Sequence, residues 1–478
     1  MAGNSKRKGK RREKMKIFSA STKDLQFGDR LVPAFYYYTK VIKQQNMQED
    51  RKSIVLGKYS TISDGEHSHI SRNKNGGVRY LYGRNIKEGV IDFDEISDDP
   101  YINPDDYEVF SRCHIKQKDV LIAIYGTVGK SAVYRKEYVG EAGIPRHISN
   151  ISLKENAPIT PEYLTAYFRS KAGKWQMFSL MTGNIQQLLS LKNLREFEIP
   201  VLKQEIMALI TENEKVAIEC EIQAHKYIKQ AQELLYEGLK FDIKEIEHEF
   251  CFGVPFSELK ENNLWSTNYY DRLFVKTAES LKKYNGAIAL EEIVEIKSGD
   301  EVGSENYHEF IQRKADDKPF IRTSDIVNWE ADLYPDYYVA EDDFADLEQD
   351  VRVNDVLFTK DGKIGCVGMI TEADHVILAS GIERLRVRES AQKKGITPEY
   401  LFTALSLKEI GRYAAIRRMV VASTIPHLRE ERLKEIEIPL IDGELMKKIT
   451  KLVKQAFTLK AQRKTLLKKN EQIFESYF

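Results

Sequence analysis

A glycine-rich segment that could bind phosphate follows an apolar run in the first quarter of the chain. It reads Gly-Thr-Val-Gly-Lys-Ser from Gly126 to Ser131. In a phosphate-binding loop, four residues separate the two glycines, so that successive backbone N–H groups surround a phosphate before Lys and Ser complete the site. Only two residues separate Gly126 from Gly129, and the residues after Ser131 alternate like a strand. The strict phosphate-binding motif is therefore absent.

The same segment occurs a second time with different chemistry. "DVLIAIYGTVGKSAV" (119–133) is matched by "DVLFTKDGKIGCVGM" (355–369), in which Cys-Val replaces Lys130 and Ser131. A phosphate site would keep its lysine and its hydroxyl, whereas a tight β-turn with glycines at positive φ needs only the glycines. The pattern predicts a glycine hairpin in each half of the chain and no nucleotide site.

Other patterns suggest methyl transfer or metal binding but lack their partners. "NPDDY" (103–107) resembles the Asn-Pro-Pro-Tyr signature of adenine methyltransferases, yet its second proline is absent and the sequence contains no glycine-rich AdoMet loop; a turn is the prediction. His67 and His69 have the spacing of two metal ligands on one strand face, but without a third ligand a polar loop is the simpler interpretation. The four cysteines form no Cys-x-x-Cys pair. We therefore predict no catalytic residue, metal or cofactor in this chain.

Further matched segments show that the chain contains an internal repeat. "ITPEYL" occurs twice without change, at 159–164 and 396–401, and its Thr-Pro-Glu order predicts a helix start with Thr as N-cap and Pro in the first turn. "LREFEIPVL" (194–202) matches "LKEIEIPLI" (433–441), and each copy then continues into a long charged segment without proline. The fold class predicted is α/β (α+β), with two homologous domains that are each followed by a long helix.

Both long segments have apolar residues alternately four and three positions apart, over about four heptads. This spacing predicts two helices of roughly 50 to 57 Å, at about 1.5 Å per residue, that form a coiled coil. Because a domain separates them, we expect them to run antiparallel, with pseudo-twofold symmetry and the domains about a helix length apart; two helices that each pack on their own domain are the alternative. Asn213, Arg463 and Asn470 would be polar register markers. The predicted seam comprises Ile206, Ile210, Asn213, Ala217, Cys220, Ala224, Tyr227, Ala231 and Leu234, with Leu445, Ile449, Leu452, Ala456, Leu459, Arg463, Leu466, Asn470 and Ile473.

Length and charge limit the class of protein. The 478 residues allow two large cores besides the helices, and the formal net charge of zero means that any positive surface is local. The basic stretch "SKRKGKRREKMK" predicts a solvated tail that could contact phosphates, and Met15 within it is an alternative start. The sequence has no apolar run near the roughly 20 residues that cross a bilayer, and no signal-peptide core. We expect a soluble, cytoplasmic protein.

Arg, Lys, Asn, Gln and Tyr gather in predicted loops at equivalent places of both copies, for example at 71–86, 143–149 and 182–190. Arg and Lys suit phosphates and guanine edges, Asn and Gln suit adenine edges, and Tyr stacks or contacts thymine methyls. The scaffold repeats while these residues differ, as expected for two readers of two different short DNA sequences. Polar loops without a ligand are the alternative for any single residue. The candidate DNA-binding residues are Lys74, Arg79, Tyr82, Arg84, Asn85, Lys130, Arg146, His147, Gln186, Gln187, Arg313, Arg322, Ser324, Lys360, Lys363, Arg417, Arg418, Thr424 and His427.

With this arrangement the chain resembles the specificity (S) subunit of type I restriction-modification systems. The resemblance covers about residues 27–478 and rests on the doubled "ITPEYL", on the Asp-Val-Leu strands with their glycine hairpins, and on two closing segments. These segments are "GNIQQLLSLKNLREFEIP" and "ASTIPHLREERLKEIEIP". The basic tail and the long bridge at 240–265 depart from the family pattern.

The resemblance implies a non-catalytic DNA reader in a phage-defence complex of a bacterium or archaeon. Each target-recognition domain would read half of a bipartite, asymmetric site in double-stranded DNA, and the helix pair would set the spacer and dock two methyltransferase subunits that bring AdoMet. Motor-nuclease subunits that use ATP and Mg would complete the complex. A specificity subunit of a motor-less or fused system, and a scaffold without sequence-specific DNA binding, are the alternatives. The predicted boundaries are 1–27 for the tail, 28–202 for the first recognition domain, 203–245 for the central helix, 246–441 for a linker and the second recognition domain, and 442–478 for the C-terminal helix.

Overall fold

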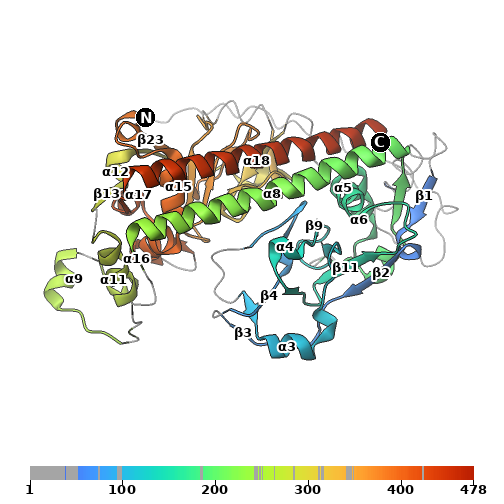
Figure 1. Ribbon diagram of the computed structural model, residues 1–478, viewed down its shortest axis with the longest axis horizontal. Coiled ribbons are helices and arrows are strands. Elements are labelled where there is room, and N and C mark those ends of the chain that lie inside the picture. The colour runs from blue at the N-terminus through green and yellow to red at the C-terminus, as the bar shows by residue number, and fades with distance from the viewer. Residues whose placement is uncertain are drawn as a thin grey trace, which may run out of the picture.

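Two long helices form the axis of the molecule, and the two halves of the chain gather around them (Figure 1). These helices are α8 (Gln204–Leu239) and α18 (Gly443–Tyr477). None of the helices described has the length and apolar character needed to cross a membrane. The structure is a computed structural model that describes residues 38, 52–73, 76–93, 100–182, 187–241, 246, 249, 251–262, 264–283, 286–309, 313, 317–340, 347, 349–421 and 425–478.

Each half of the chain builds the same pair of four-stranded sheets, with the strands in the same order. In the first half the orders are β2 (Ser60–Asp64), β11 (Ile148–Leu153), β8 (Val120–Ala123), β9 (Ser131–Val133), and β10 (Ala142–Gly143), β4 (Val78–Tyr80), β7 (Tyr101–Ile102), β3 (Arg72–Asn73). In the second half they are β14 (Val294–Ser298), β23 (Ile382–Val387), β20 (Val356–Thr359), β21 (Val367–Met369), and β22 (Ile377–Leu378), β16 (Lys318–Ile321), β19 (Tyr337–Val339), β15 (Tyr307–Glu309).

Shorter strand pairs complete the two halves. A hairpin of β5 (Ile86–Lys87) and β6 (Val90–Ile91) in the first half corresponds to one of β17 (Ile326–Val327) and β18 (Glu330–Ala331) in the second. Antiparallel ribbons of β1 (Lys52–Val55) with β12 (Glu198–Val201), and of β13 (Ala287–Ala289) with β26 (Glu437–Pro439), join the start and end of each half. The second half also pairs β24 (Val420–Val421) with β25 (Pro426–His427).

Helices cover the sheets and connect the halves. The first half has α3 (Pro104–Val109), α4 (Lys136–Val139), α5 (Pro161–Arg169), α6 (Lys171–Leu180) and α7 (Leu191–Arg195). The connecting segment has α9 (Phe256–Asn262), α10 (Thr267–Tyr270) and α11 (Arg272–Leu281). The second half has α12 (Leu290–Ile293), α14 (Glu389–Gln392), α15 (Pro398–Ser406), the π-helix η9 (Lys408–Arg412), α16 (Tyr413–Arg418) and α17 (Glu430–Lys434).

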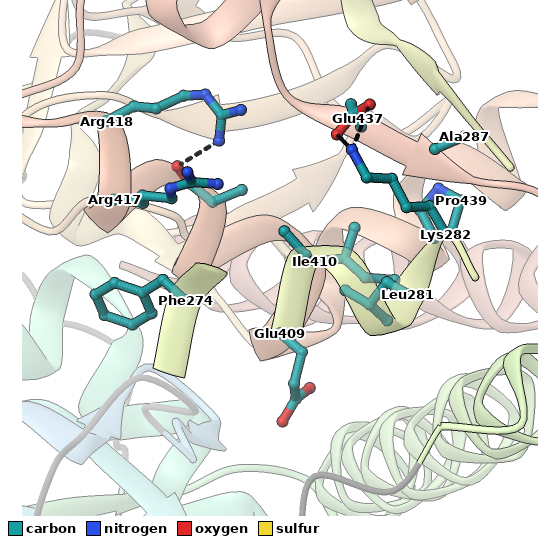
Figure 2. Close-up of a pocket in the computed structure, with 12 residues that line it drawn as sticks. Phe274, Leu281, Lys282, Ala287, Glu409, Ile410, Arg417, Arg418, Glu437 and Pro439 are labelled. Carbon is teal, nitrogen blue, oxygen red and sulfur yellow. Dashed lines mark hydrogen bonds and ion pairs between the residues drawn. The ribbon is translucent and has the colours of Figure 1, made fainter. Parts of the chain in front are cut away.

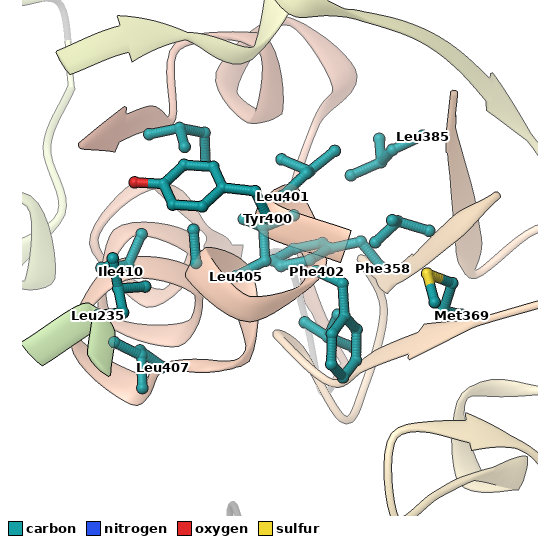
Figure 3. Packing of buried hydrophobic residues seen from close by; sticks show 14 of the residues in the cluster. Leu235, Phe358, Met369, Leu385, Tyr400, Leu401, Phe402, Leu405, Leu407 and Ile410 are labelled. Atoms are coloured by element: carbon teal, nitrogen blue, oxygen red, sulfur yellow. The ribbon is translucent and has the colours of Figure 1, made fainter. Parts of the chain in front are cut away.

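Strands β8 and β20 are almost entirely apolar because both of their faces are buried. In β20, Val356 and Phe358 face the core that α15 covers, whereas Leu357 faces the core shared with the β17–β18 hairpin. Successive strand residues point to opposite faces, so an uninterrupted apolar run is required here. Figure 3 shows Phe402 and other α15 side chains packed among residues of the sheet, with Leu235 of α8 beside them.

The repeated "ITPEYL" segment fastens each domain to the long helix that follows it. The Thr160 hydroxyl accepts a hydrogen bond from Tyr163 N as an N-cap, and its oxygen lies 2.9 Å from the hydroxyl of Thr211 in α8. The Tyr163 hydroxyl donates to Pro200 O at 3.0 Å. The same bonds in the second half join Tyr400 to Thr397, Thr397 to Thr450 of α18, and Tyr400 to Pro439. The two copies of this segment therefore make the same contacts, which explains why their sequences are identical.

"NPDDY" starts a helix instead of forming the predicted turn. Asn103 takes the N-cap position with extended backbone, and Pro104 is the first helical residue of α3. Proline suits this position because its missing N–H would have no partner in the first turn. The residues that resembled a methyltransferase loop thus have a local structural role.

The long helices run antiparallel and are in contact along their length. Near one end, Asn213 Nδ2 donates to Asn470 Oδ1 at 2.7 Å, and further along Glu221 faces Lys460 at 3.1 Å. Asn470 Nδ2 also donates to Ile210 O at 3.1 Å. Two buried amides that satisfy each other fix one register, because a shift would leave them without partners.

The buried face of α18 is wider than the predicted seam. At five seam positions of α18, the residue that follows the predicted seam residue is more buried than the seam residue itself, because the two domains cover that side of the helix. They are Met446, Val453, Lys460, Leu467 and Phe474, whereas Leu445, Leu452, Leu459, Leu466 and Ile473 are only partly buried. The heptad pattern missed this second stripe, since part of it is charged.

The two domains are in direct contact, which the expected separation of about a helix length did not include. The β17–β18 hairpin of the second half touches the first half directly, where Asn328 Oδ1 accepts a hydrogen bond from Phe93 N at 3.0 Å. Lys130 of the first half also pairs with Asp336 of the second at 2.7 Å. Both halves meet beside the middle of the helix pair.

Candidate nucleic-acid interface

The glycine hairpins are tight turns, as predicted. Gly126 and Gly129 have φ of 77° and 89°, and Gly362 and Gly365 have φ of 61° and 84°. Side chains rarely adopt this backbone region, so glycine is favoured at all four positions. Space is also limited at Gly365, where an added Cβ would lie 3.0 Å from the Cα of Arg412.

In the first domain a returning loop runs beside the glycine hairpin. Thr182 and Leu188 exchange two backbone hydrogen bonds of 2.9 and 2.8 Å, and Leu188 also forms a bridge with Tyr125. Leu189 N then donates to Ile124 O at 3.0 Å. The hairpin tip and the returning loop therefore share one edge of the domain.

The second domain repeats this arrangement with different residues. Gly362 N donates to Pro426 O at 3.0 Å, and Leu428 N donates to Lys360 O at 2.9 Å. The Asp361 carboxylate accepts a hydrogen bond from the Nδ1 of His427. The backbone bonds hold the two loops together. At the position where the first domain has Tyr125 beside Leu188, the second has Asp361 beside His427.

Further loops meet at the same two edges. In the first domain the Thr127 hydroxyl donates to Gly83 O at 3.3 Å, and the rings of Tyr125 and His147 lie 5.2 Å apart. In the second, an added Cβ on Gly381 would lie 2.9 Å from Thr323 and 3.3 Å from Asp361. We call residues 82–84, 125–129, 146–147 and 187–188 the first loop edge, and residues 322–324, 360–363, 380–381 and 425–427 the second loop edge.

The first loop edge combines cations, aromatic rings and an exposed apolar tip. The guanidinium of Arg84 lies 4.1 Å from the ring centroid of Tyr82, and that of Arg72 lies 3.6 Å from the same ring. Leu188 is 36% exposed at the tip of the returning loop. Burial and the neighbouring Arg146 lower the pKa of His147, so its imidazole is neutral near pH 7. These groups suit phosphates, base edges and thymine methyls.

The second loop edge is apolar at its tip and more balanced in charge. Ile425 is 60% exposed. Lys360 Nζ pairs with the buried Glu383 carboxylate at 2.7 Å, and Arg322 lies 3.4 Å from Asp336 and 4.2 Å from the ring centroid of Tyr337. This edge therefore offers hydrogen-bonding groups and apolar contact with less net positive charge.

About half of the predicted DNA-binding residues come together in this way. Tyr82, Arg84, Arg146, His147 and Gln187 lie on the first loop edge, and Arg322, Ser324, Lys360, Lys363 and His427 lie on the second. Lys74, Gln186 and Thr424 lie outside the described residues.

Two predicted residues of the first domain serve the fold instead. Asn85 is buried, where its Oδ1 accepts from Tyr82 N at 2.6 Å and its Nδ2 donates to Asp92 O at 2.9 Å. Arg79, which lies in β4, donates a hydrogen bond to Phe93 O at 3.1 Å. The side chain of Asn85 caps a turn, and that of Arg79 ties β4 to the segment that follows β6. Both residues therefore lie outside the first loop edge.

Two further predicted residues join separate parts of the molecule. Lys130 is buried and pairs with Asp336; burial disfavours its charge, but the carboxylates facing it outweigh this and raise the pKa of Lys130. Arg313 pairs with Glu471 of α18 and lies 5.3 Å from the ring centroid of Tyr338. The structure gives both cations internal partners in place of the predicted DNA contact.

Arg417 holds the connecting segment against the second domain, and Arg418 is bonded within that domain. Arg417 Nε donates to Tyr269 O at 2.9 Å, and Arg418 donates to Glu435 O at 3.3 Å. Figure 2 shows the small pocket between α11 and the domain, where Phe274 of the segment lies near Arg417, and Leu281 lies near Ile410 of the domain. Both arginines therefore have partners within the chain and lie outside the second loop edge, and their contact with DNA stays a prediction. The packed residues, in α10 and α11, follow the bridge at 240–265, whose helix α9 has no buried residue.

Sequence reasoning missed several residues of the loop edges. Arg72 lies on an adjacent strand, Thr127 and Asp361 lie inside the glycine hairpins, and Leu188 and Ile425 are apolar. The hairpin residues could have been included, because the two glycines mark the turn tip. The two apolar tip residues could not have been predicted, since the sequence does not show that they are exposed.

The described part of the chain contains no group of three residues that could hold a metal ion. His67 lies in an exposed loop, where its Nε2 is 2.9 Å from Asp64 Oδ2. This placement agrees with the polar-loop interpretation of that segment.

Comparison with known proteins gives a family for the second half of the chain. Residues 284–469 match the family model of the type I restriction modification DNA specificity domain. The second repeat is therefore similar to a DNA specificity domain of this type. The resemblance stated from the sequence is confirmed for residues 284–469, which contain the second loop edge. No curated protein matches the sequence.

Solved structures with similar chains include specificity subunits. The S subunit of a type I restriction-modification system from M. genitalium is 15% identical, with a TM-score of 0.35 over 89% of this chain and 94% of that chain. The HsdS subunit from Thermoanaerobacter tengcongensis is 15% identical, with a TM-score of 0.27 over 90% and 97%. A chain from a structure of type I R-M complex assembly is 14% identical, with a TM-score of 0.27 over 89% and 96%.

Proposed function

We propose that this chain is the non-catalytic DNA-recognition subunit of a type I restriction-modification complex. Each loop edge would read one half of a bipartite, asymmetric target in the major groove. One observation carries the proposal: the two loop edges occupy equivalent positions on a repeated scaffold, but the first presents Arg84 and the Tyr125–Leu188 pair where the second presents Ser324 and the Asp361–His427 pair. A shared scaffold would orient both readers alike, and different side chains would select different bases.

The helix pair would act as a coiled-coil ruler between the two target-recognition domains. Thirty-six residues in α8 correspond to a length of about 54 Å at about 1.5 Å per residue. Major-groove faces on one side of the duplex recur every 34 to 36 Å or so, which suits half-sites one to two turns apart. Combining two short half-sites multiplies specificity, because the penalties for mismatches add.

The chemistry would come from partner subunits. Two methyltransferase subunits docked on the helix pair would bring AdoMet for adenine methylation, and motor-nuclease subunits would bring ATP and Mg. The loop edges offer groups for binding, while this chain supplies no proposed catalytic residue. Such a complex works on DNA in the cytoplasm of a bacterium or archaeon.

The first experiment is base-modification sequencing of the host genome with the gene present and deleted. We expect adenine methylation at one gapped motif to disappear on deletion, which would give both half-sites and the spacer. An unchanged methylation pattern at an expressed locus would contradict the proposal and favour a scaffold role. Restriction of incoming phage DNA by the same locus would separate a complete complex from one that only methylates.

A second experiment tests the first loop edge on a duplex that carries the motif. Arg84→Ala is expected to weaken binding by about tenfold or more, since a specific Arg contact contributes about 1–3 kcal/mol. Lys447→Ala is the matched control, because it removes one positive charge from the exposed start of α18. Equal binding by both variants and by the unmodified chain would remove Arg84 from the interface.

A further inference from the structure

The hairpin β17–β18 makes three different attachments through three consecutive residues. Asn328 bonds to the first domain, Trp329 packs against α8, and Glu330 pairs with cations of α18. The ring of Trp329 lies 5.1 Å from that of His225 and 5.0 Å from Lys229 Nζ. One short hairpin therefore ties the second domain to the first domain and to both long helices.

Asn328 is the residue that crosses between the domains. Its Oδ1 accepts from Phe93 N at 3.0 Å, and its Nδ2 donates to Ile91 O at 2.9 Å and lies 3.3 Å from the hydroxyl of Tyr138. Asn328 is 6% exposed, so water cannot replace these bonds. A single amide thus satisfies backbone groups on either side of Asp92 in the first domain.

The backbone of this hairpin is unusual. Asn328 and Trp329 have φ of 47° and 67°, whereas the corresponding turn of the first domain has Glu88 followed by Gly89 at 77°. Asn tolerates positive φ, but Trp adopts it at a cost. The attachments of the Trp329 ring and the Asn328 amide offset that cost, because both side chains are buried in contacts.

An ion pair and a lysine extend the contact between the domains. Lys130 Nζ lies 2.7 Å from Asp336 Oδ1, and Lys87 Nζ donates to Ser324 O at 3.4 Å. Lys87 and Lys130 come from the first domain, next to its own hairpin and glycine turn, while Ser324 lies on the second loop edge. The contact therefore joins structures immediately behind the two loop edges.

We infer that the β17–β18 hairpin is a clasp that fixes the relative orientation of the two loop edges. On this view the clasp sets the accepted spacer length together with the helix pair, and Asn328 is a positioning residue for spacer selectivity. The helices alone fix a distance, but rotation of a domain about its attachment would still move its loop edge along the DNA. The effect on spacer length rests on the proposed function, whereas the orientation of the domains can be measured without DNA.

The test uses Asn328→Gly in the full-length chain. Glycine adopts the positive φ of Asn328 without strain and removes only the side chain that carries the amide. Gln232→Ala is the matched control, because this buried amide joins α8 to Ser406 of the second domain at 2.9 Å and is not part of the clasp. Both variants lose a buried amide, so a general loss of stability would affect them alike.

The first measurement is the distance between spin labels in the two domains, without DNA. Val109→Cys in α3 and Val353→Cys carry the labels, since these residues are 74% and 52% exposed. Cys251→Ser removes the exposed native thiol, and the other three cysteines are buried. We expect a broader or shifted distance distribution for Asn328→Gly and an unchanged one for Gln232→Ala. An unchanged distribution in Asn328→Gly overturns the clasp.

The second measurement is binding to duplexes whose spacer is the native length, one base pair shorter or one base pair longer. Asn328→Gly is expected to reduce the preference for the native spacer by about tenfold, the factor that corresponds to one buried hydrogen bond, with unchanged half-site preference. A broadened distance distribution with an unchanged spacer preference would show that the helices alone set the spacer, which overturns the role of Asn328 in selectivity. Failure of the unmodified chain to prefer any gapped duplex would count against the proposed function, and the label distances would still decide whether the clasp exists.

Discussion

Removing the charge of Glu330 is expected to destabilise the attachment of the second domain to α18. Glu330 lies 3.1 Å from Lys460, 3.2 Å from Arg463 and 3.0 Å from Lys464. Glu221 and Asp374 pair with the same cations, and each side chain of this central ionic cluster is at most 5% exposed. The cluster contains three carboxylates and three cations, so it is neutral as a whole.

The size of the effect follows from this balance. Glu330→Gln keeps the shape of the side chain but leaves one positive charge without compensation in a buried site. Breaking a buried ion pair by removing one partner costs about 3–5 kcal/mol. With a urea dependence of about 3 kcal/mol per molar, the unfolding midpoint would fall by about 1–1.7 M.

Urea unfolding followed by tryptophan fluorescence is a direct assay. Trp329 is next to Glu330 and buried, whereas Trp265 is 72% exposed and responds little. Glu444→Gln is the control, because its pair with Lys447 is exposed at the start of α18 and should leave the midpoint unchanged.

A double variant decides whether charge balance is the cause. Lys464→Met combined with Glu330→Gln restores the neutrality of the cluster. The double variant should therefore lose less free energy of unfolding than the two single variants lose in total. A midpoint for Glu330→Gln that equals that of the unmodified chain would refute the reasoning, since it would mean that the other two carboxylates suffice for three buried cations.

Three other predictions concern the cap, the hairpin and the acid response. Thr397→Val removes a helix N-cap and the bond to Thr450, and should lower the free energy of unfolding by about 0.5–2 kcal/mol in thermal or urea unfolding. Gly365→Ala should destabilise more than Gly362→Ala, because both impose positive φ on alanine but only the first brings a Cβ within 3.0 Å of backbone; equal thermal midpoints would contradict this. Burial raises the pKa of Glu330, but its three cations outweigh this and hold it at about 2, below the ordinary 4.5. The carboxylate's contribution is therefore complete above pH 4.5 and is lost as the pH falls toward 2, so urea midpoints measured across that window should fall more for the unmodified chain than for Glu330→Gln.

The sequence by itself determined the repeated scaffold and its main local features. Repeated segments such as "ITPEYL" contain a capping threonine followed by proline, an order that favours the start of a helix. Two closely spaced glycines between apolar strands indicate a turn. Asn213 and Asn470 stood out as polar residues in apolar stripes, and the structure places them in contact. These features depend on interactions within a few residues or on a regular period, and both can be read from the order of residues.

Only the tertiary structure decided which charged side chains face solvent and which are paired inside. Arg417 resembles a DNA contact in the sequence, yet it binds Tyr269, which lies 148 residues earlier. Lys130 pairs with Asp336 and Asn328 bonds to Phe93 across more than 200 residues. No local pattern carries the identity of such partners, because the same lysine or asparagine is compatible with solvent, with DNA or with a buried partner until the two halves of the chain are brought together.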